Sequence, residues 1–382
     1  MSQLNPADIV HTGPGTLAGR YMRTFWQPVY RAEDLAPGRS TPIRIMGEQF
    51  TLYRGEEGSP HVVAFRCAHR GTQLSTGWVE GDTLRCMYHG WRYDGSGQCV
   101  EQPGEEESFA GKIKIRSCPT EEYLGLIFAY LGDGEAPPLR RYPQMEGTGV
   151  LEVYAPEIWP CNYFNRIDNA CDAAHVVFAH RESRLAVDEL PQLPTLSAEE
   201  TEYGVRTRVV TQGKPEWSLC FIMPNTNHFR ASIRLRDPQA PKGMVNRLIW
   251  RVPIDDESCV SFTMDFAGLT GDASKEYLER RRKMRQATAT PAGDLGSAAL
   301  AGKFHIGEVK NQPNLKNLTS LEDYVVQVGQ GAIADRSNER LGRIDVGVIL
   351  LRKAWERELR ALAEGGPLKR WTVPEDLTNG DA

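Results

Sequence analysis

The first third of the chain alternates hydrophobic and polar residues over short runs, which is typical of β-strands. Glycine and aspartate pairs such as Gly81-Asp82 and Asp94-Gly95 separate these runs and predict turns. The predicted strands are residues 49–53, 61–65, 83–85 and 124–130. The pattern indicates a compact all-β domain. A stretch rich in glycine and proline follows at residues 132–138, so we place a domain junction there and expect domains 1–140 and 141–382.

The remainder of the chain mixes strand and helix periodicities. Helical character at residues 162–180 is followed by predicted strands at 204–210, 228–235, 245–252 and 259–266. Further helices are predicted at 274–287, 321–330 and 344–363. In the last of these, apolar side chains recur every three or four residues, at Val348, Leu351, Trp355, Leu359 and Leu362. A broad antiparallel sheet with helices on one face is the simplest packing of these elements.

Composition limits the classes of function. A chain of 382 residues with 40% hydrophobic residues can bury the cores of two domains. The formal net charge of −5 argues against a nucleic-acid partner, which would need a basic surface. One strongly basic run, residues 280–285, is expected to be a solvated helix face; the alternative is a docking patch for an acidic protein.

The sequence also predicts a soluble, cytoplasmic protein with no membrane partner. Residues 1–10 lack the basic start and apolar core of a secretory signal. The longest apolar run, residues 124–131, is far too short to span a bilayer. Eight cysteines in a chain of this length do not indicate a disulfide framework, so we expect thiols or metal ligands.

Two short clusters of cysteine and histidine provide the strongest chemical signal. They are Cys67-Ala68-His69-Arg70-Gly71 and Cys86-Met87-Tyr88-His89-Gly90. Two such clusters, each ending in glycine, fit paired loops that approach one metal centre from two sides. A zinc site is one interpretation, but Cys-x-His spacing is too close for typical zinc ligands. Coincidental core residues are a second. A Rieske [2Fe–2S] centre, in which two histidines replace two cysteines, is the interpretation that we favour.

Cys67-x-His69 and Cys86-x-x-His89 resemble the signature of the Rieske non-haem iron oxygenases, in the oxygenase (alpha) subunits of the phthalate, phenoxybenzoate and vanillate type. The resemblance implies that Cys67 and Cys86 bind one iron, and His69 and His89 the other.

High-potential Rieske proteins add two cysteines, where this chain has Thr72 and Tyr88, and a serine, where it has Trp91. We therefore expect a potential toward the low end of the Rieske range of roughly −150 to +300 mV. The remaining cysteines are expected to be small buried hydrophobic residues: Cys99, Cys118, Cys161, Cys171, Cys220 and Cys259.

A second group of potential ligands lies in residues 169–180. Asp172 and His175 are three residues apart and are predicted to share a helical face. His175 and His180 would lie about 140° apart around an ideal helix, so convergence on one metal requires a break near Phe178. Two histidines and one carboxylate form the facial triad of non-haem Fe(II) oxygenases.

The family resemblance assigns roles to this second group, whose run Asp172-x-x-His175-x₄-His180 after Asn169 is similar to the family's iron-binding motif. It implies that His175 and His180 bind iron. It also implies that Asp172 links His89 of one subunit to His175 of the next, with Asp168 as the alternative carboxylate.

The third ligand is expected in residues 322–336, where the resemblance points to Asp323. Asp335 and Asp345 are alternatives, and Asp335 is expected instead to form a structural ion pair with Arg336.

The resemblance further implies a fold and an activity. The fold would be α+β: an N-terminal all-β Rieske domain followed by a helix-grip (START-like) catalytic domain with a large antiparallel sheet. A separate reductase or ferredoxin would supply electrons from NAD(P)H. With O₂ as co-substrate, the mononuclear Fe(II) would hydroxylate, dihydroxylate or O-demethylate a small aromatic substrate. A homo-oligomer, trimer or hexamer, is implied.

Some predictions rest on weaker signals. The glycines at 13, 15 and 19 fail as a dinucleotide fingerprint because no strand precedes them and their spacing is wrong. The single-chain pattern resembles oxygenases that act on aromatic carboxylates and aryl ethers. Possible pocket residues are Ile222, Met223, Asn225 and His228. Two rival functions are an electron carrier with a degenerate second domain and a zinc-stabilised binding module.

Overall fold

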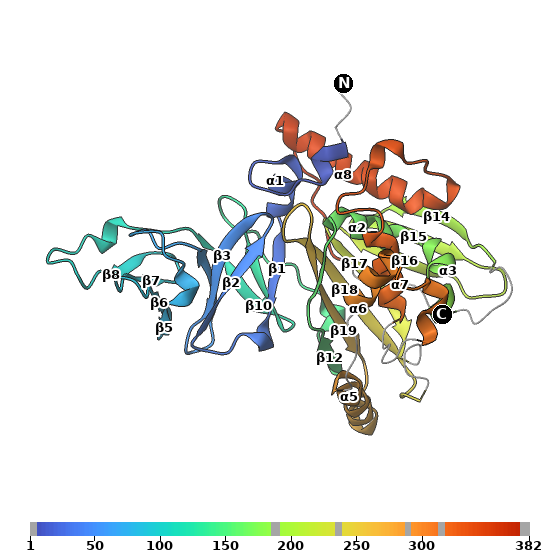
Figure 1. The fold of residues 1–382 in the computed structure, drawn as a ribbon, viewed down its shortest axis with the longest axis horizontal. Helices are drawn as coiled ribbons and strands as arrows, with labels where there is room; N and C mark the ends of the chain where they lie inside the picture. The colour runs from blue at the N-terminus through green and yellow to red at the C-terminus, as the bar shows by residue number, and fades with distance from the viewer. Residues whose placement is uncertain (1–5, 185–191, 234–238, 287–291, 312–317, 375–382) are drawn as a thin grey trace. The chain divides into compact units, whose positions relative to one another are not determined.

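The computed structural model describes residues 6–184, 192–233, 239–286, 292–311 and 318–374. The chain forms two compact units. The first comprises His11–Arg140 with Val252–Asp255, and the second comprises Met1–Val10, Arg141–Arg251 and Asp256–Ala382. Figure 1 shows the elements of both units.

The first unit is built from three small sheets. One has the order β1-β11-β10, with bounds Trp26–Arg31, Leu126–Tyr130 and Thr120–Tyr123. The second has the order β2-β3-β4-β9, with bounds Arg39–Ile45, Glu48–Arg54, Pro60–Ala64 and Ser117–Cys118. The third has the order β5-β6-β7-β8, with bounds Trp78–Glu80, Thr83–Arg85, Arg92–Asp94 and Cys99–Glu101. A short helix, α1 (Leu17–Arg23), precedes them. The predicted all-β domain is thus confirmed.

Two-residue turns set the register of two hairpins in this unit. Met46 and Gly47 have φ of 48° and 78°, and Leu124 and Gly125 have φ of 51° and 74°. Consecutive positive φ angles give the twist that joins antiparallel strands tightly. The strand predicted at 124–130 therefore begins at Leu126, because its first two residues form the turn.

The second unit contains, among its described residues, an eight-stranded sheet. The order is β12-β19-β18-β17-β16-β15-β14, and β13 also pairs with β19. The bounds are Val150–Val153 (β12), Glu157–Trp159 (β13), Thr195–Glu200 (β14), Gly204–Val210 (β15), Trp217–Ile222 (β16), Thr226–Ser232 (β17), Met244–Pro253 (β18) and Cys259–Ala267 (β19). The predicted large antiparallel sheet is confirmed. The end of the strand predicted at 228–235 lies outside the described residues.

The second unit also contains helices, some of which pack on this sheet. The helices are α2 (Tyr163–Cys171), α3 (His175–Phe178), α4 (Arg181–Arg184), α5 (Gly271–Gln286), α6 (Ala292–Leu300), α7 (Leu318–Val328) and α8 (Val346–Glu364). Helices α2 and α8 pack on β15, and α7 packs against α2 and α6 (Figure 1). No described helix is long and apolar enough to cross a membrane.

Helix α8 confirms the predicted hydrophobic face. Val348, Leu351, Trp355 and Leu359 are buried, whereas Leu362 is only half-buried near the helix end. The helix comes so close to its neighbours that a Cβ added at Gly347 would lie 2.4 Å from both Cys171 O and Thr207 Oγ1. Only glycine therefore fits where α8 meets α2 and the sheet.

The basic run at 280–285 lies in α5. Arg280 and Lys283 form i, i+4 ion pairs with Glu276 and Glu279 on the same helix, as expected of a solvated face. Arg281 differs, because its side chain turns to the buried Glu152, 2.7 Å away.

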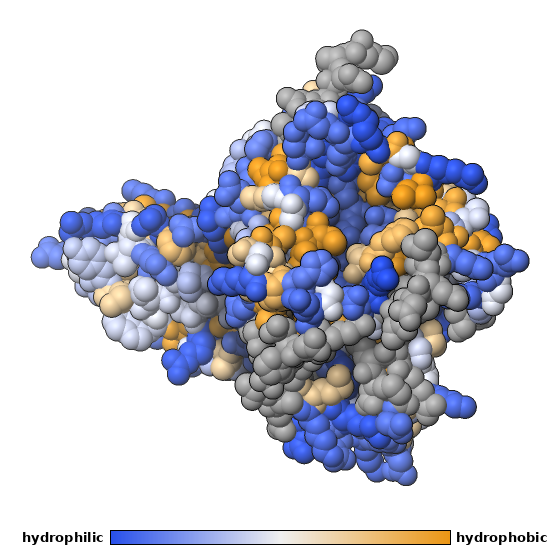
Figure 2. Space-filling view, turned by 45° about the vertical axis from the view of Figure 1, so that its right-hand side comes forward, coloured by the Kyte–Doolittle hydropathy of each residue, from blue (hydrophilic) through white to orange (hydrophobic). Residues whose placement is uncertain are grey.

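On the face shown in Figure 2, hydrophobic residues gather in patches between hydrophilic ones.

Candidate metal centres

The two cysteine–histidine clusters fold into loops with the same internal hydrogen bonds. Cys67 N donates to Thr72 O (2.8 Å) and Gly71 N donates to Cys67 O (2.9 Å). In the second loop, Cys86 N donates to Trp91 O (2.8 Å) and Gly90 N donates to Cys86 O (3.0 Å). Both loops close on a left-handed glycine, with φ of 71° at Gly71 and 74° at Gly90.

The four candidate ligands of these loops divide by burial. Cys67 and Cys86 are buried, with their thiols side by side, while His69 and His89 are exposed. The two imidazole rings are 4.5 Å apart between centroids. Burial raises the pKa of the Cys86 thiol, so a bound metal would be needed to hold it as thiolate. Two inner thiols and two outer imidazoles fit the donor set of a Rieske [2Fe–2S] cluster.

Tyr93 on β7 is a functional candidate that the sequence did not reveal. Its hydroxyl lies 3.2 Å from Cys67 Sγ and accepts a hydrogen bond from Ala68 N. Trp91 occupies the position where high-potential Rieske proteins have a serine hydroxyl. Tyr93 supplies one from two residues further along the chain, while the Trp91 ring stacks on His69 at 4.7 Å.

The second candidate centre lies where the predicted helix 162–180 breaks. Helix α2 ends at Cys171, and Asp172 has extended backbone angles (φ −89°, ψ 104°). Its Oδ1 accepts from Ala174 N (2.9 Å) and His175 N (3.2 Å), so it caps the start of α3. The prediction that Asp172 and His175 share one continuous helical face was therefore wrong. A second break follows Phe178, where α3 ends, as the spacing of the histidines required.

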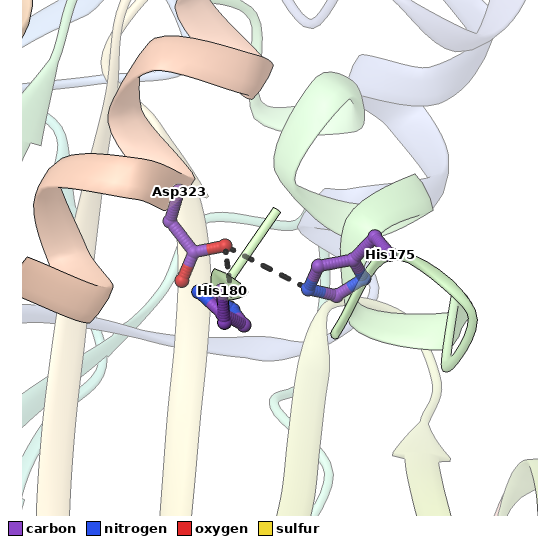
Figure 3. Close-up of side chains that lie close together, drawn as sticks. All are labelled: His175, His180 and Asp323. Atoms are coloured by element: carbon purple, nitrogen blue, oxygen red, sulfur yellow. Dashed lines mark ion pairs between the residues drawn. The ribbon is translucent and has the colours of Figure 1, made fainter. Parts of the chain in front are cut away.

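These breaks bring His175 and His180 together with Asp323 of α7 (Figure 3). His175 Nε2 lies 3.7 Å from Asp323 Oδ1, and His180 Nε2 lies 3.6 Å from the same oxygen. The three ligand atoms all lie within 4.8 Å of one another. Ligands at right angles around a metal at about 2.1 Å are about 3 Å apart, so a small contraction would suit a metal ion. Two imidazoles and a carboxylate fit a facial triad.

The second nitrogen of each histidine is held by an acceptor. His175 Nδ1 lies 2.5 Å from the backbone oxygen of Asp172, and His180 Nδ1 lies 3.1 Å from Glu322 Oε2. Donation from Nδ1 leaves each Nε2 unprotonated and facing Asp323. Burial lowers the pKa of His175, which favours the neutral imidazole that binds metal.

Two amide side chains hold Asp323. Gln327 Nε2 donates to its Oδ1 at 3.1 Å, and Asn169 Nδ2 does so at 3.4 Å. Because Gln327 is one turn along α7 and Asn169 belongs to α2, the carboxylate is fixed from both helices.

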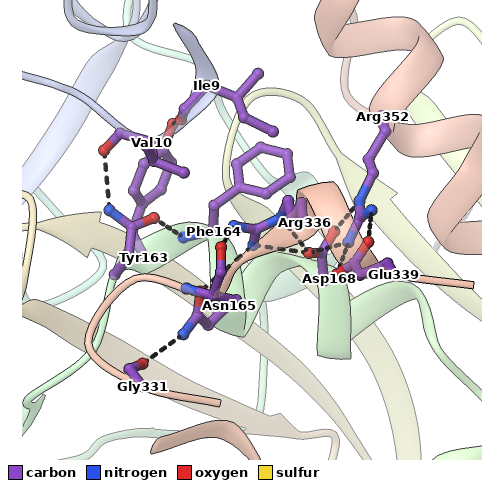
Figure 4. A network of polar contacts seen from close by, with 12 residues as sticks. Ile9, Val10, Tyr163, Phe164, Asn165, Asp168, Gly331, Arg336, Glu339 and Arg352 are labelled. Carbon is purple, nitrogen blue, oxygen red and sulfur yellow. Dashed lines mark hydrogen bonds and ion pairs between the residues drawn. The ribbon is translucent and has the colours of Figure 1, made fainter. Parts of the chain in front are cut away.

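The alternative carboxylates have other partners. Asp168 pairs with Arg336 (2.9 Å) and Arg352 (2.7 Å), which ties α2 to α8 (Figure 4). Asp335 accepts from Ser337 N (3.0 Å) and caps a short helical turn. The expected ion pair between Asp335 and Arg336 is therefore wrong, because Arg336 turns to Asp168. Asp345 accepts from Gly342 N at 2.6 Å.

The guessed pocket residues fall into two groups. Ile222 and His228 lie on the face of the sheet opposite to that of Thr207, whose hydroxyl donates to Cys171 O on α2. Met223 and Asn225 lie in the connection between β16 and β17, where Asn225 Nδ2 donates to Arg251 O. These positions give no evidence that any of the four residues contacts a substrate.

Two arginines, the buried Arg166 and the half-buried Arg251, lie beside the second centre. Arg166 on α2 and Arg251 on β18 both donate to Ser261 Oγ, at 2.8 and 2.7 Å. Among the described residues, neither has a carboxylate within ion-pair distance, and burial with the neighbouring Arg166 lowers the pKa of Arg251 to about 9. Arg166 packs on Trp159, which contacts Tyr324 next to Asp323. Positive charge thus accumulates near the candidate triad.

Comparison with known proteins extends these findings. The family model "Rieske [2Fe-2S] domain" matches residues 25–120. The chain is 28% identical to the oxygenase subunit of 5,5'-dehydrodivanillate O-demethylase from Sphingobium, over 94% of this chain and 80% of the relative. It is also 28% identical to the alpha subunit of phenoxybenzoate dioxygenase from Ectopseudomonas oleovorans, over 92% and 84%. The solved structure of Pseudomonas putida CBB5 NdmA with caffeine shares the fold, with a TM-score of 0.64 at 20% identity over 93% of this chain and 98% of that one.

Proposed function

Because this chain belongs to the Rieske non-haem iron oxygenases and is their terminal oxygenase component, we propose that it binds its two iron centres through the residues described above. Cys67, Cys86, His69 and His89 would hold the [2Fe–2S] cluster. His175, His180 and Asp323 would hold the mononuclear Fe(II). The convergence of these last three side chains is the observation that carries the proposal, since an electron carrier alone would not need it.

When bound, the two centres would supply electrons, drawn from NAD(P)H through a separate reductase, and open positions for O₂ beside the substrate. The protein's own contribution is to fix the ligands. Nδ1 donation orients both imidazoles, and Asn169 and Gln327 keep the Asp323 carboxylate turned toward them. This fixes the ligand geometry before metal enters.

We assign Asp172 to the connection between subunits. Its Oδ2 lies 3.8 Å from His175 Nδ1, and its side chain is 27% exposed, so the carboxylate is open to a second chain. His89 is exposed on the cluster loop. A cyclic trimer, or a hexamer of two trimers, would let His89 of one subunit meet Asp172 of the next. Met87 and Tyr88, half-exposed beside His89, would then be covered by protein.

For the electron donor, we propose a separate reductase or ferredoxin that docks on the part of the cluster-bearing unit that the neighbouring subunit leaves uncovered. We place the protein in the cytoplasm, where NAD(P)H is available. No nucleic-acid or membrane partner is part of this proposal.

For the substrate, we propose a small aromatic carboxylate, with O-demethylation of an aryl methyl ether as the first reaction to test. The relatives named for dehydrodivanillate and phenoxybenzoate both take aromatic acids. The positive charge of Arg166 and Arg251 near the triad, which Asp323 offsets only in part, favours an anionic ligand. Ring dihydroxylation, as in the name of the second relative, is the alternative.

Product analysis tests this function directly. Purified protein, a compatible reductase, NADH and O₂ are incubated with methoxylated and unsubstituted aromatic acids and with their methyl esters. Formaldehyde and a phenol from the free acid, with little turnover of the ester, are expected. A cis-diol would favour dihydroxylation. Reduction of the cluster by NADH with no oxidised product from any substrate would leave only the electron-carrier function.

A further inference from the structure

Glu322, the residue before the proposed ligand Asp323, contacts a different ligand. Its side chain is 1% exposed, and its Oε2 lies 3.1 Å from Nδ1 of His180. Its Oε1 accepts from Glu182 N (2.9 Å) and Ser183 N (3.0 Å), at the start of α4. One carboxylate on α7 therefore holds both the ring of His180 and the backbone that follows it.

The two histidines are held by different acceptors. A neutral backbone oxygen accepts from His175, whereas a buried carboxylate accepts from His180. A charged acceptor makes the stronger hydrogen bond and makes the opposite ring nitrogen a better electron donor to a metal. The two proposed ligands therefore differ in the charge of the group that accepts from Nδ1.

We propose that Glu322 is a positioning residue for the mononuclear metal, which fixes the tautomer of His180 and the distance between the two ligand-bearing segments. This inference rests on the ligand set proposed above. Because Glu322 and Asp323 are adjacent on α7, any movement of the helix displaces the third ligand together with the support of the second.

The Glu322 carboxylate accepts both from His180 and from the backbone at the start of α4, and the isosteric substitution Glu322→Gln can preserve only one of these two roles. An amide has one acceptor oxygen and one donor NH₂, but all three groups around Glu322 are donors. If the NH₂ faces His180, then Nδ1 must accept and the proton moves to Nε2, the metal-binding atom. If it faces the backbone N–H groups, the start of α4 loses its cap. Either arrangement weakens metal binding.

Glu358 provides a matched control. It is also a buried glutamate at 1% exposure, and it accepts from Lys369 N at 2.9 Å and from Arg357, with no contact to a proposed ligand. Glu358→Gln should therefore cost stability without changing metal affinity.

The experiment measures the Fe²⁺ dissociation constant of the full-length protein, anaerobically and by competition with a chelator, after metal is stripped from the mononuclear site. Visible absorbance follows the cluster throughout. Glu322→Gln should weaken Fe²⁺ binding about 10–100-fold, the effect usual for groups that support a metal ligand. Glu358→Gln should leave it unchanged. Wild-type affinity in Glu322→Gln, or an equal loss in Glu358→Gln, would overturn the proposal.

A double-mutant cycle distinguishes positioning from general support of the fold. In a His180→Ala background, Glu322→Gln should weaken Fe²⁺ binding little further; a full additional loss would overturn the proposal. Glu322→Asp, which withdraws the carboxylate by one methylene, replaces Glu322→Gln if that variant does not fold, with a loss again expected. If His180→Ala alone binds Fe²⁺ as tightly as the wild type, the proposed ligand set is wrong, and the proposal for Glu322 is wrong as well.

Discussion

The hydroxyl of Tyr93 lies 3.2 Å from the sulfur of Cys67, in a core that also contains Tyr53. A hydroxyl that donates to a cluster sulfur withdraws electron density and raises the reduction potential. Burial and this contact with Cys67 raise the pKa of Tyr93 well above its usual value, so it remains a protonated donor at neutral pH.

Tyr93→Phe should therefore lower the midpoint potential of the cluster. A hydrogen bond of about 0.5–1.5 kcal/mol corresponds to roughly 20–60 mV for one electron. Protein-film voltammetry measures the shift. The control is Tyr53→Phe, which removes a hydroxyl equally buried in the same unit but bonded to Asp82 O. Equal potentials in the wild type and Tyr93→Phe would refute the hydrogen bond to the cluster.

Asp172→Asn should retain the cluster spectrum and the fold but abolish turnover. The asparagine oxygen can still cap Ala174 N and His175 N, whereas the charge proposed to link two imidazoles is lost. Single-turnover kinetics of cluster oxidation in the presence of substrate checks this. Asp335→Asn, at another aspartate that caps a helical turn, should turn over normally. Near-normal rates for Asp172→Asn would exclude the bridging role.

His175→Ala should lose the mononuclear iron while the red-brown colour of the cluster remains. The variant removes one of the three proposed ligands from the second unit and changes none of the proposed cluster ligands in the first. Iron and acid-labile sulfide analysis should give about two irons and two sulfides per chain, as one [2Fe–2S] cluster requires. Full retention of a third iron would show that His175 is not a ligand.

His228 should make the protein less stable in mild acid. Burial lowers the pKa of this ring to about 4, because the neighbouring Asn246 offsets only part of the cost of burying the charged form. The unfolded chain takes up this proton near pH 6.5, but the folded chain does so only near pH 4. Stability is thus full above pH 6.5 and falls as the pH drops toward 4, by about 2 kcal/mol between pH 8 and pH 5.

Urea unfolding of the wild type and His228→Leu at both pH values isolates this contribution. The variant should lose about 2 kcal/mol less on acidification than the wild type. His305→Gln, at an exposed histidine, should behave as the wild type does. Parallel losses in all three proteins would mean that His228 is protonated in the folded state.

Local patterns predicted much of the fold. The predicted strands at 83–85 and 204–210 match β6 and β15, and the apolar spacing of α8 gave its buried face. The breaks around His175 could be anticipated only in part. The angle between the histidines required a break near Phe178, but the capping role of Asp172 depends on backbone angles that no residue spacing encodes.

The residues that support the two candidate centres could not be predicted from the sequence, for a different reason. Glu322 contacts a proposed ligand 142 positions away, and Tyr93 contacts a cysteine 26 positions away. Such partners are set by how helices and strands pack, whereas the ligands themselves stand out through short spacing and distinctive chemistry. Asp335 illustrates the opposite error, since sequence adjacency suggested a partner that the packing of Arg336 on Asp168 excludes.

The short helix α3 is severed from α2 on one side and from α4 on the other. Its four residues begin at one proposed ligand, and the next ligand follows in the adjoining turn. Neither histidine is therefore carried on a long helix, and the groups that accept from their Nδ1 atoms, the Asp172 backbone oxygen and the Glu322 carboxylate, set the positions of the two rings.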